Sequence, residues 1–364
     1  MNSILQLARP DILNLQPYQH AAWEPSLERM HANEMPWRAD GDATTAGLNR
    51  YPEPQPIELI EHLAELYDVT PECVLAGRGS DEGIDLLVRS FCRAGVDSVM
   101  ICPPTFGMYK VSARIQGAGL IEVPLLKDQS FALDIDAVLA AWVPECKLIF
   151  LCTPNNPTGG LIERAAIERL CEEMTDKALI VVDEAYIEFA GIGSISSELH
   201  RFTNLVVLRT LSKAYALAGA RCGALLAHPD IVSLLANVIT PYSLPTQTIE
   251  AVLKFTDGEH RVAASRRIAA ILGERARLSE RLAKMSAIRR IWNSAANFLL
   301  VECADKAQVF AAAQSAGLII RNPVSPFLCG CLRISVGTPE QNDRLLGAIE
   351  RIAGAAAPAH VSNQ

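Results

Sequence analysis

Beyond Arg209, which opens it, the stretch RTLSKAYALAGARCG, residues 209–223, carries two cations among mostly small and apolar residues. Lys213 follows Ser212 directly after the apolar run NLVVLRT, and Arg221 comes eight positions later. A lysine that is desolvated in a pocket has a lowered pKa and becomes nucleophilic, whereas a guanidinium binds anions through paired donors. The alternative is a surface lysine whose stem lies along apolar neighbours. The pair therefore indicates either a reactive amine beside an anion site or two solvated charges.

Two further polar groups come at the ends of apolar runs. Asp183 closes the run in ALIVVDEAY, and the loop TPNNPTGG, residues 153–160, follows KLIFLC. Ligands of open parallel sheets bind at the carboxyl ends of the strands, and a carboxylate buried there is costly unless it is paired. The alternatives are a helix N-cap at Asp183 and an ordinary turn in the loop. We also expect a cis peptide bond between Asn156 and Pro157, because X–Pro is the only common cis setting.

The stretch GRGSDEGI, residues 77–84, opens a predicted helix. Its glycines allow a sharp turn, and Ser80 and Asp81 stand where unpaired backbone N–H groups begin the helix, which makes an anion cradle. Gly77, Gly79 and Gly83 form only an incomplete dinucleotide-binding fingerprint. The alternative is that Ser80 or Asp81 simply caps the helix.

These groups occur in one order, each after a predicted strand of one sheet. A ligand with a phosphate, an aromatic cation and an aldehyde would engage all of them, and pyridoxal 5'-phosphate (PLP) carries these three groups. In PLP enzymes a lysine forms a Schiff base with the aldehyde and an aspartate pairs with the pyridinium nitrogen. The combination therefore predicts a PLP enzyme.

The chain resembles the class II aminotransferases of fold type I, and within them the histidinol-phosphate aminotransferases, from about residue 11 to residue 352. The resemblance rests on these stretches, in order: NRYPEPQP, RGSDEGI, CPPTFGMY, TPNNPTG, VVDEAYIEF, RTLSKAYALAGARCG and GCLRISVG. It implies an α/β fold, the three-layer αβα arrangement of PLP transferases, and a homodimer. It also implies amino transfer from L-histidinol phosphate to 2-oxoglutarate, giving imidazole acetol phosphate and glutamate, in histidine biosynthesis.

The resemblance also implies roles for individual residues. Lys213 would carry the cofactor and move a proton, Asp183 would hold the pyridinium, and Tyr186 would bond the ring oxygen. Phe106 would stack on the ring without the hydroxyl of the tyrosine that the family often has there. The residues implied to bind the cofactor, which include the catalytic Lys213, Asp183 and Tyr186, are Ser80, Asp81, Phe106, Asn156, Asp183, Tyr186, Ser212, Lys213 and Arg221.

A second set faces the substrate. Arg333 matches the family's carboxylate-binding arginine, and NEMP at residues 33–36 stands where the family has NENP. Tyr51 lies in a proline-rich stretch that we expect to be an extended arm. The resemblance implies that Tyr51 reaches the partner's site, and the alternative is packing within its own chain. The implied substrate-binding residues are Tyr18, Asn33, Tyr51, Tyr242, Arg321 and Arg333.

Other functions share parts of this pattern. A PLP enzyme acting on aromatic amino acids, or a threonine-phosphate decarboxylase, would carry nearly the same motifs, and their products would distinguish them. A nicotinamide-dependent oxidoreductase would use the glycines of residues 77–83 but not Lys213. A cofactor-sensing regulator would need a DNA-binding segment, which the first forty residues do not resemble.

The elements that position these residues alternate along the chain. The runs DSVMICPP, KLIFLCTP, ALIVVDEAY and NLVVLRT predict buried strands, GALLAH predicts another, and helices are expected at 81–93 and 161–176. This rhythm predicts a mostly parallel sheet. Further on we expect a helix over 255–287, the strands NFLLVEC, GLIIRN and CLRISVG, and helices at 305–316 and 339–353. The expected domains are 41–250, then 1–40 with 251–355, and a flexible tail at 356–364.

Composition narrows the class of protein. The 364 residues are 50% hydrophobic with a net charge of −8, which suits a large core and argues against nucleic acid or an anionic membrane as partner. We find no signal peptide pattern and no long apolar run, so a cytoplasmic protein without a membrane span is expected. The ten cysteines are scattered, and Cys329 and Cys331 lack a second pair at zinc-binding spacing. We therefore expect reduced thiols and no metal.

Overall fold

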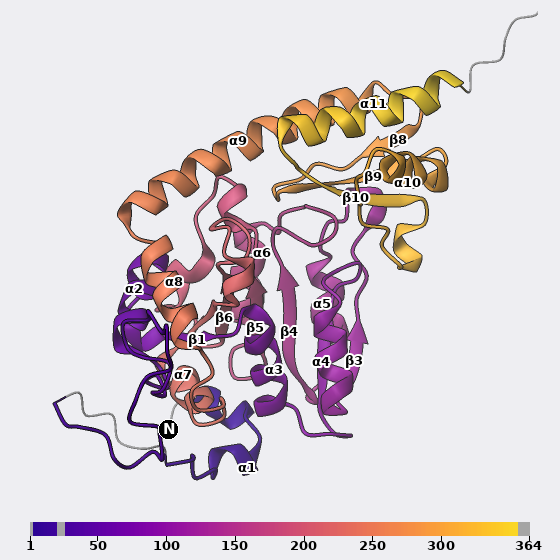
Figure 1. Cartoon of the computed structure of the whole chain (residues 1–364). Coiled ribbons are helices and arrows are strands. Elements are labelled where there is room, and N and C mark those ends of the chain that lie inside the picture. Colours follow the sequence, from indigo (N-terminus) through magenta and orange to yellow (C-terminus); the bar gives the residue numbers. More distant parts are fainter. Residues whose placement is uncertain (1–2, 20–25, 356–364) are drawn as a thin grey trace, which may run out of the picture.

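The computed structural model describes residues 3–19 and 26–355, so the expected tail at 356–364 lies outside the described residues. Its centre is a seven-stranded sheet with the order β1-β7-β6-β5-β4-β2-β3 (Figure 1). The strands are β1 (Val74–Gly77), β2 (Ser98–Ile101), β3 (Gly119–Glu122), β4 (Cys146–Cys152), β5 (Leu179–Asp183), β6 (Leu205–Thr210) and β7 (Gly223–Ala227). Strands β2 to β6 pair in parallel, and β7 runs antiparallel to both β6 and β1. The predicted strands and the mostly parallel sheet are confirmed.

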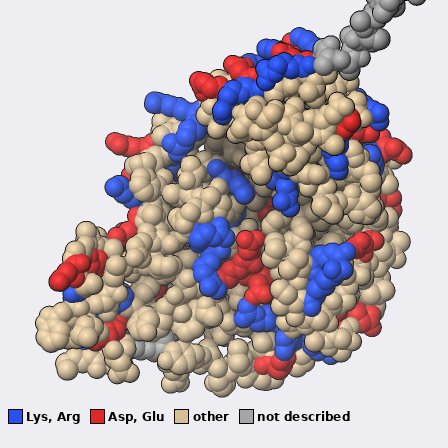
Figure 2. Space-filling model, turned by 45° about the vertical axis from the view of Figure 1, so that its right-hand side comes forward, with Lys and Arg blue, Asp and Glu red and all other residues tan. Residues whose placement is uncertain are grey.

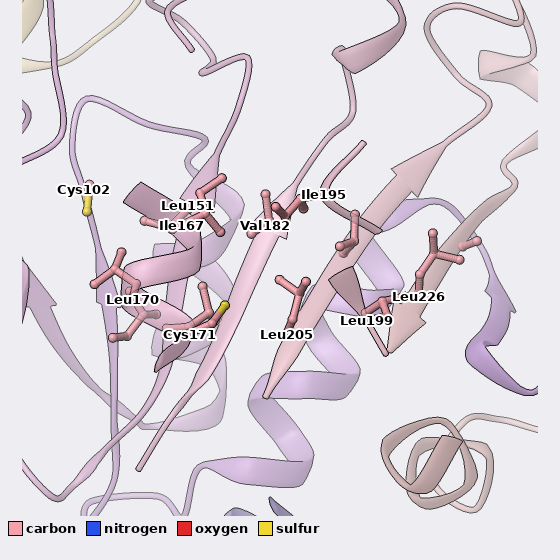
Figure 3. Packing of buried hydrophobic residues seen from close by; sticks show 14 of the residues in the cluster. Cys102, Leu151, Ile167, Leu170, Cys171, Val182, Ile195, Leu199, Leu205 and Leu226 are labelled. Atoms are coloured by element: carbon pink, nitrogen blue, oxygen red, sulfur yellow. The ribbon is translucent and has the colours of Figure 1, made fainter. Parts of the chain in front are cut away.

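Helices cover both faces of this sheet. One face carries α2 (Ile57–Tyr67), α5 (Ile135–Ala141), α6 (Arg164–Glu173) and α8 (Thr246–Phe255), and the other carries α3 (Ser80–Phe91), α4 (Met108–Gln116) and α7 (Pro229–Ala236). Figure 3 shows the first face, where Leu151, Val182 and Leu205 of adjacent strands share one apolar cluster with Ile167, Leu170 and Cys171 of α6. Because both faces are covered, the middle strands are apolar along nearly their whole length. The three-layer αβα fold is therefore confirmed.

A smaller antiparallel sheet, β8 (Ile288–Ile291), β9 (Phe298–Cys303) and β10 (Cys331–Ser335), follows in the sequence. It packs against α9 (Gly258–Ala283), α10 (Lys306–Ser315) and α11 (Pro339–Ala355), with α9 and α11 running above it in Figure 1. The predicted strands NFLLVEC and CLRISVG are confirmed. The predicted strand GLIIRN is wrong, because only Arg321 bridges to β10 and the nearby Pro323 lacks an N–H. Sequence reasoning missed β8, whose two central arginines are exposed.

The helix expected over 255–287 is confirmed as α9, which spans Gly258–Ala283, and a separate helix, α8, precedes it. Helix α8 ends at Phe255, and α9 begins after Asp257, whose side chain accepts a hydrogen bond from the His260 N–H at 2.9 Å. This N-cap starts a new helix after a break of two residues. Leu278 and Leu282 near the end of α9 pack onto the small sheet. Within the described residues, no helix is both long and apolar enough to cross a bilayer.

The N-terminal segment packs against the large sheet. Ile4 and Leu7, in the 3-10 helix η1 (Ser3–Leu7), are buried in the same core as Leu87 of α3 and Ile231 of α7. Beyond them α1 (Pro10–Leu13) begins, and the Arg9 side chain donates to the Arg89 carbonyl at 2.9 Å. We expected residues 1–40 to belong with the smaller part of the chain. Residues 3–13 instead pack on the large sheet, because their apolar side chains share a core with α3 and α7.

Candidate active site

Lys213 lies three residues beyond the end of β6, in the turn that leads to β7. Its Nζ is 5.7 Å from the ring centre of Tyr186, and the residue is exposed to solvent. Partial desolvation, together with the nearby positive charge of Arg333, lowers the pKa of its ammonium group. A lowered pKa makes the neutral, nucleophilic amine easier to reach at neutral pH. This environment favours a reactive amine over a snorkelling surface lysine.

Asp183 ends β5 and is only 2% exposed. Its carboxylate accepts hydrogen bonds from the Tyr109 hydroxyl at 2.7 Å and from the Ala185 N–H at 3.1 Å. Burial raises the pKa of this carboxyl to about 6, although both hydrogen bonds act in the opposite direction. The next helical turn, η4 (Ile187–Phe189), has Tyr186 at its N-cap, so Asp183 is not a helix cap. A buried carboxylate whose bonded partners are neutral is the expected counterpart of a cationic ligand.

The loop after β4 is held from two sides. The Asn155 side chain donates to the Pro104 carbonyl at 2.8 Å, and the Gly159 carbonyl accepts from the Ala295 N–H at 2.8 Å. The peptide bond between Asn156 and Pro157 is cis, as predicted from the sequence, and so is the one before Pro154. The Asn156 side-chain oxygen accepts a hydrogen bond from Arg333 of β10. The loop therefore aims Asn156 toward the small sheet.

The N-terminus of α3 has no side-chain cap. Gly79 occupies the N-cap position with φ +82°, and Ser80 and Asp81 are the first helical residues, so the alternative of an ordinary side-chain N-cap is not found. A Cβ on Gly79 would come within 3.1 Å of the Arg221 guanidinium, and a Cβ on Gly223 would lie 2.9 Å from Gly79 backbone atoms. Close approach of these segments thus requires glycine at both positions.

Arg221 completes an anion cradle at this helix end. Its half-exposed guanidinium lies 3.5 Å from the Asp81 carboxylate and 3.4 Å from the Arg78 carbonyl oxygen. Both contacts are long, so a better acceptor can replace them. Unpaired N–H groups, the helix dipole and a guanidinium together favour a phosphate.

Two arginines lie on the opposite wall. Arg321 and Arg333 exchange backbone hydrogen bonds of 3.0 and 2.9 Å. The Arg333 guanidinium lies 5.1 Å from the ring centre of Phe298, and its buried Nε has no hydrogen-bond partner among the described residues. Figure 2 shows the surface hollowed below the part of the molecule that holds the small sheet, with basic side chains around the hollow. This wall can receive a second anion.

Three further residues predicted to bind the cofactor are Tyr186, Phe106 and Ser212. Tyr186 is buried edge-on against Phe298, with ring centres 5.2 Å apart, and burial raises its pKa. Phe106 is partly buried against the ring of Tyr109 at 5.6 Å. The Ser212 N–H donates to the Thr210 hydroxyl at 3.2 Å. Every residue predicted to bind the cofactor is thus found at the carboxyl ends of β4, β5 and β6 or in the segments that face them.

Within one chain, not all of the predicted substrate-binding residues lie beside the residues predicted to bind the cofactor. Tyr51 and Tyr242 stack on each other with ring centres 4.6 Å apart, and Tyr51 remains 49% exposed. Tyr18 is 71% exposed, and Asn33 is exposed with φ +56°. These residues lie in or against the N-terminal segment, which reaches out from the body of the molecule at lower left in Figure 1.

Sequence reasoning missed two residues that hold site residues in place. Tyr109 bonds Asp183, and the Glu34 carboxylate accepts the Tyr51 N–H at 2.7 Å. Tyr109 lies in the motif CPPTFGMY with the predicted Phe106, and Glu34 lies in NEMP with the predicted Asn33. Among the described residues, no three His, Cys, Asp or Glu side chains come together as metal ligands would.

Residues 26–349 match the family described as aminotransferase class I and II. The chain belongs to this family. It is 44% identical to the histidinol-phosphate aminotransferase of Stenotrophomonas maltophilia (strain R551-3) over 354 residues, which cover 96% of this chain and 97% of that relative. The resemblance found in the sequence motifs is thus confirmed, and the chain is an aminotransferase of class I and II.

Solved structures agree with this assignment. The histidinol-phosphate aminotransferase from Sinorhizobium meliloti, in complex with pyridoxal-5'-phosphate, aligns with a TM-score of 0.74 at 26% identity, covering 85% of this chain and 84% of that one. The L-threonine-O-3-phosphate decarboxylase from Porphyromonas gingivalis aligns with a TM-score of 0.69 at 22% identity, covering 84% and 91%. Because the second likeness shows the fold alone, the fold does not separate amino transfer from decarboxylation.

Proposed function

We propose that this aminotransferase moves an amino group between L-histidinol phosphate and 2-oxoglutarate in histidine biosynthesis, with PLP as cofactor. The observation that carries the proposal is the buried Asp183 carboxylate, which has only neutral hydrogen-bond partners and shares one site with Lys213. The high identity to relatives named for this reaction supports the choice of substrate.

The residues present fit PLP. The uncapped N-terminus of α3 with Arg221 and Ser212 would hold its phosphate, Asp183 its ring nitrogen, and Asn156 and Tyr186 its ring oxygen. Phe106 would lie against its ring. When bound, PLP supplies an electrophilic carbon for the amino group and an electron sink for the carbon that loses its proton.

The chain's own residues then handle the proton. The lowered pKa of Lys213 suits its Nζ to take the proton from the substrate carbon that bears the amino group, and later to return it. The ionised Asp183 keeps a proton on the ring nitrogen, because a cation beside a buried carboxylate is strongly favoured.

The two substrates present different anions to one site. Histidinol phosphate carries a phosphate ester and no carboxylate, whereas 2-oxoglutarate carries two carboxylates. Arg321 and Arg333 face each other across a backbone bridge, and their guanidiniums can bind either group, since arginine pairs with carboxylate and phosphate in the same two-pronged way. One arginine pair therefore serves both halves of the reaction.

We infer a homodimer in which Tyr51 acts in the partner's site. Support comes from exposed apolar side chains concentrated in and beside the N-terminal segment, namely Leu27, Met30, Met35, Trp37, Leu48, Tyr51 and Ile57. Such a concentration marks an interaction surface. A cytoplasmic location is inferred from the ten cysteines, which are all free thiols.

A panel of amine donors with 2-oxoglutarate, followed by glutamate formation and carbon dioxide release, tests the function. We expect glutamate with histidinol phosphate at a kcat/KM at least tenfold above that with aromatic amino acids. Faster turnover of aromatic amino acids, or release of carbon dioxide from threonine phosphate, would contradict the assignment. Borohydride reduction and peptide mapping should place the pyridoxyl label on Lys213 and on no other lysine.

A further inference from the structure

Tyr109 is fully buried and held on both sides of its ring. It lies in the first turn of α4, stacks on Phe150 of β4 with ring centres 4.7 Å apart, and meets the edge of Phe106 at 5.6 Å. Its hydroxyl points at the end of β5 and donates to Asp183 Oδ2 at 2.7 Å. The other carboxylate oxygen, Oδ1, accepts the Ala185 N–H. The two donors together fix the plane of the Asp183 carboxylate.

We propose that Tyr109 is a positioning residue for the cofactor: its hydroxyl keeps Asp183 ionised and in one orientation, and so strengthens binding of the pyridinium. This inference rests on the proposed role of Asp183 toward the ring nitrogen. A hydrogen bond donated to the charged form of a buried acid favours that form, and the effect is larger than for a neutral acceptor.

Several titratable groups face Asp183 from the surrounding elements. They are Tyr109 of α4, Cys152 of β4, Asp81 of α3, Tyr186 after β5 and Lys213 after β6. The charges of Asp81 and Lys213 act on the Asp183 carboxyl in opposite directions. Burial raises the pKa values of Tyr109, Tyr186 and Cys152, so these groups stay neutral through the range where Asp183 titrates. Tyr109 is the side chain whose hydrogen bond most strongly favours the ionised form.

The test uses cofactor-free protein of the full chain and follows PLP binding by fluorescence between pH 5 and 8. Tyr109→Phe removes one hydroxyl and keeps the ring contacts. In the wild type, affinity should fall as the pH drops through about 6, because a protonated Asp183 cannot pair with a pyridinium. In Tyr109→Phe we expect the midpoint to rise by about one pH unit, so that Kd rises about threefold at pH 6.5 and nearly tenfold at pH 5. Ionisation of PLP itself is common to both proteins.

Tyr67→Phe is the matched control. Tyr67 is also buried, and its hydroxyl has no hydrogen-bond partner among the described residues. Its ring lies 4.5 Å from the Arg209 guanidinium, on the opposite face of the sheet from Tyr109. The binding curve of this variant should match the wild type. If Tyr109→Phe does not fold, Tyr109→Met removes the same hydroxyl with an adaptable apolar side chain.

PLP binding by the double variant Asp183→Asn/Tyr109→Phe distinguishes a failure of this inference from a failure of the proposed function. If Tyr109 acts through Asp183, adding Tyr109→Phe to Asp183→Asn should weaken PLP binding no further. A full additional loss there, or a wild-type binding curve for Tyr109→Phe alone, would overturn the inference and leave the proposed function standing. Wild-type PLP affinity in Asp183→Asn itself would instead refute the role of Asp183.

Discussion

Arg333 of β10 donates a hydrogen bond to the side-chain oxygen of Asn156, in the loop after β4. The bond joins residues that are 177 positions apart and connects the small sheet to the large one. Desolvation lowers the pKa of the Arg333 guanidinium, and its buried Nε has no hydrogen-bond partner among the described residues. Asn156 therefore orients the group that we propose to receive substrate anions.

Replacing Arg333 with lysine tests this arrangement. Lysine keeps the charge but cannot bond Asn156 and a carboxylate with one planar group. We expect Arg333→Lys to raise KM for 2-oxoglutarate at least tenfold, equal to a loss of about 1.4 kcal/mol, measured by steady-state kinetics. Arg289→Lys, at an exposed position of β8, is the control. Equal KM values for the two variants would contradict the proposed role.

Asp183 should destabilise the cofactor-free protein at neutral pH. Its folded-state pKa of about 6 lies above the ordinary value of 3.8, so the folded protein binds this proton more tightly than the unfolded chain does. The cost of the buried charge is therefore present above pH 6 and absent below about pH 4. Asp183→Asn should raise the free energy of unfolding at pH 8 by up to about 3 kcal/mol and leave it unchanged at pH 3.5.

Urea unfolding of the two cofactor-free proteins across this pH range measures the difference. Asp136→Asn, at a side chain that is 81% exposed, is the matched control and should show no comparable rise. A stability gain in Asp183→Asn that is the same at both pH values would show that the charge is not its cause.

Glu34 anchors the backbone of Tyr51. Its carboxylate accepts the Tyr51 N–H at 2.7 Å, is 2.9 Å from the Arg50 guanidinium and also pairs with Arg29. Its side chain is only 3% exposed, so removing it leaves these cations without their buried partner. We expect Glu34→Ala to raise KM for histidinol phosphate severalfold, because Tyr51 loses its fixed position. Glu53→Ala, in the same stretch, is the comparison, and an equal effect would argue against a specific anchor.

Complementation tests whether Tyr51 acts across a dimer. Lys213→Ala and Tyr51→Ala homodimers should each be nearly inactive. If Tyr51 serves the partner's site, a heterodimer of the two variants carries both lesions in one site and leaves the other intact. Mixed and refolded protein should then regain up to about a quarter of wild-type activity, since half of the dimers are mixed and each has one intact site. No recovery, with mixed dimers shown to form, would place Tyr51 in its own chain's site.

The nature of the site was predictable from local features. Asp183 ends and Lys213 follows runs that are apolar along most of their length, and such runs are typical of buried parallel strands. Parallel strands bring their carboxyl ends to one edge, so the order of polar residues along the chain predicted that they would meet. The glycines before Ser80 predicted a sharp turn into the helix but left an ordinary N-cap open, and the structure places Gly79 at the N-cap with φ +82° and no side-chain cap.

Element boundaries and edge strands were harder to predict. The helix expected over 255–287 begins three residues later, at Gly258, because the Asp257 carboxylate caps the start of α9. The segment GLIIRN has an apolar pattern typical of a strand, but only Arg321 finds a backbone partner on β10. Pairing depends on what lies beside a segment in space, which its own residues do not specify.

By itself the sequence determined the mostly parallel sheet and the family of the chain, because burial patterns and turn motifs act over a few residues. Only the tertiary structure decided which side chains hold these residues in place. Tyr109 bonds Asp183 across 74 residues, and Arg333 bonds Asn156 across 177. Such contacts depend on how α4 and β10 pack against the sheet. The periodicity of the sequence does not predict the direction of a single hydroxyl or guanidinium.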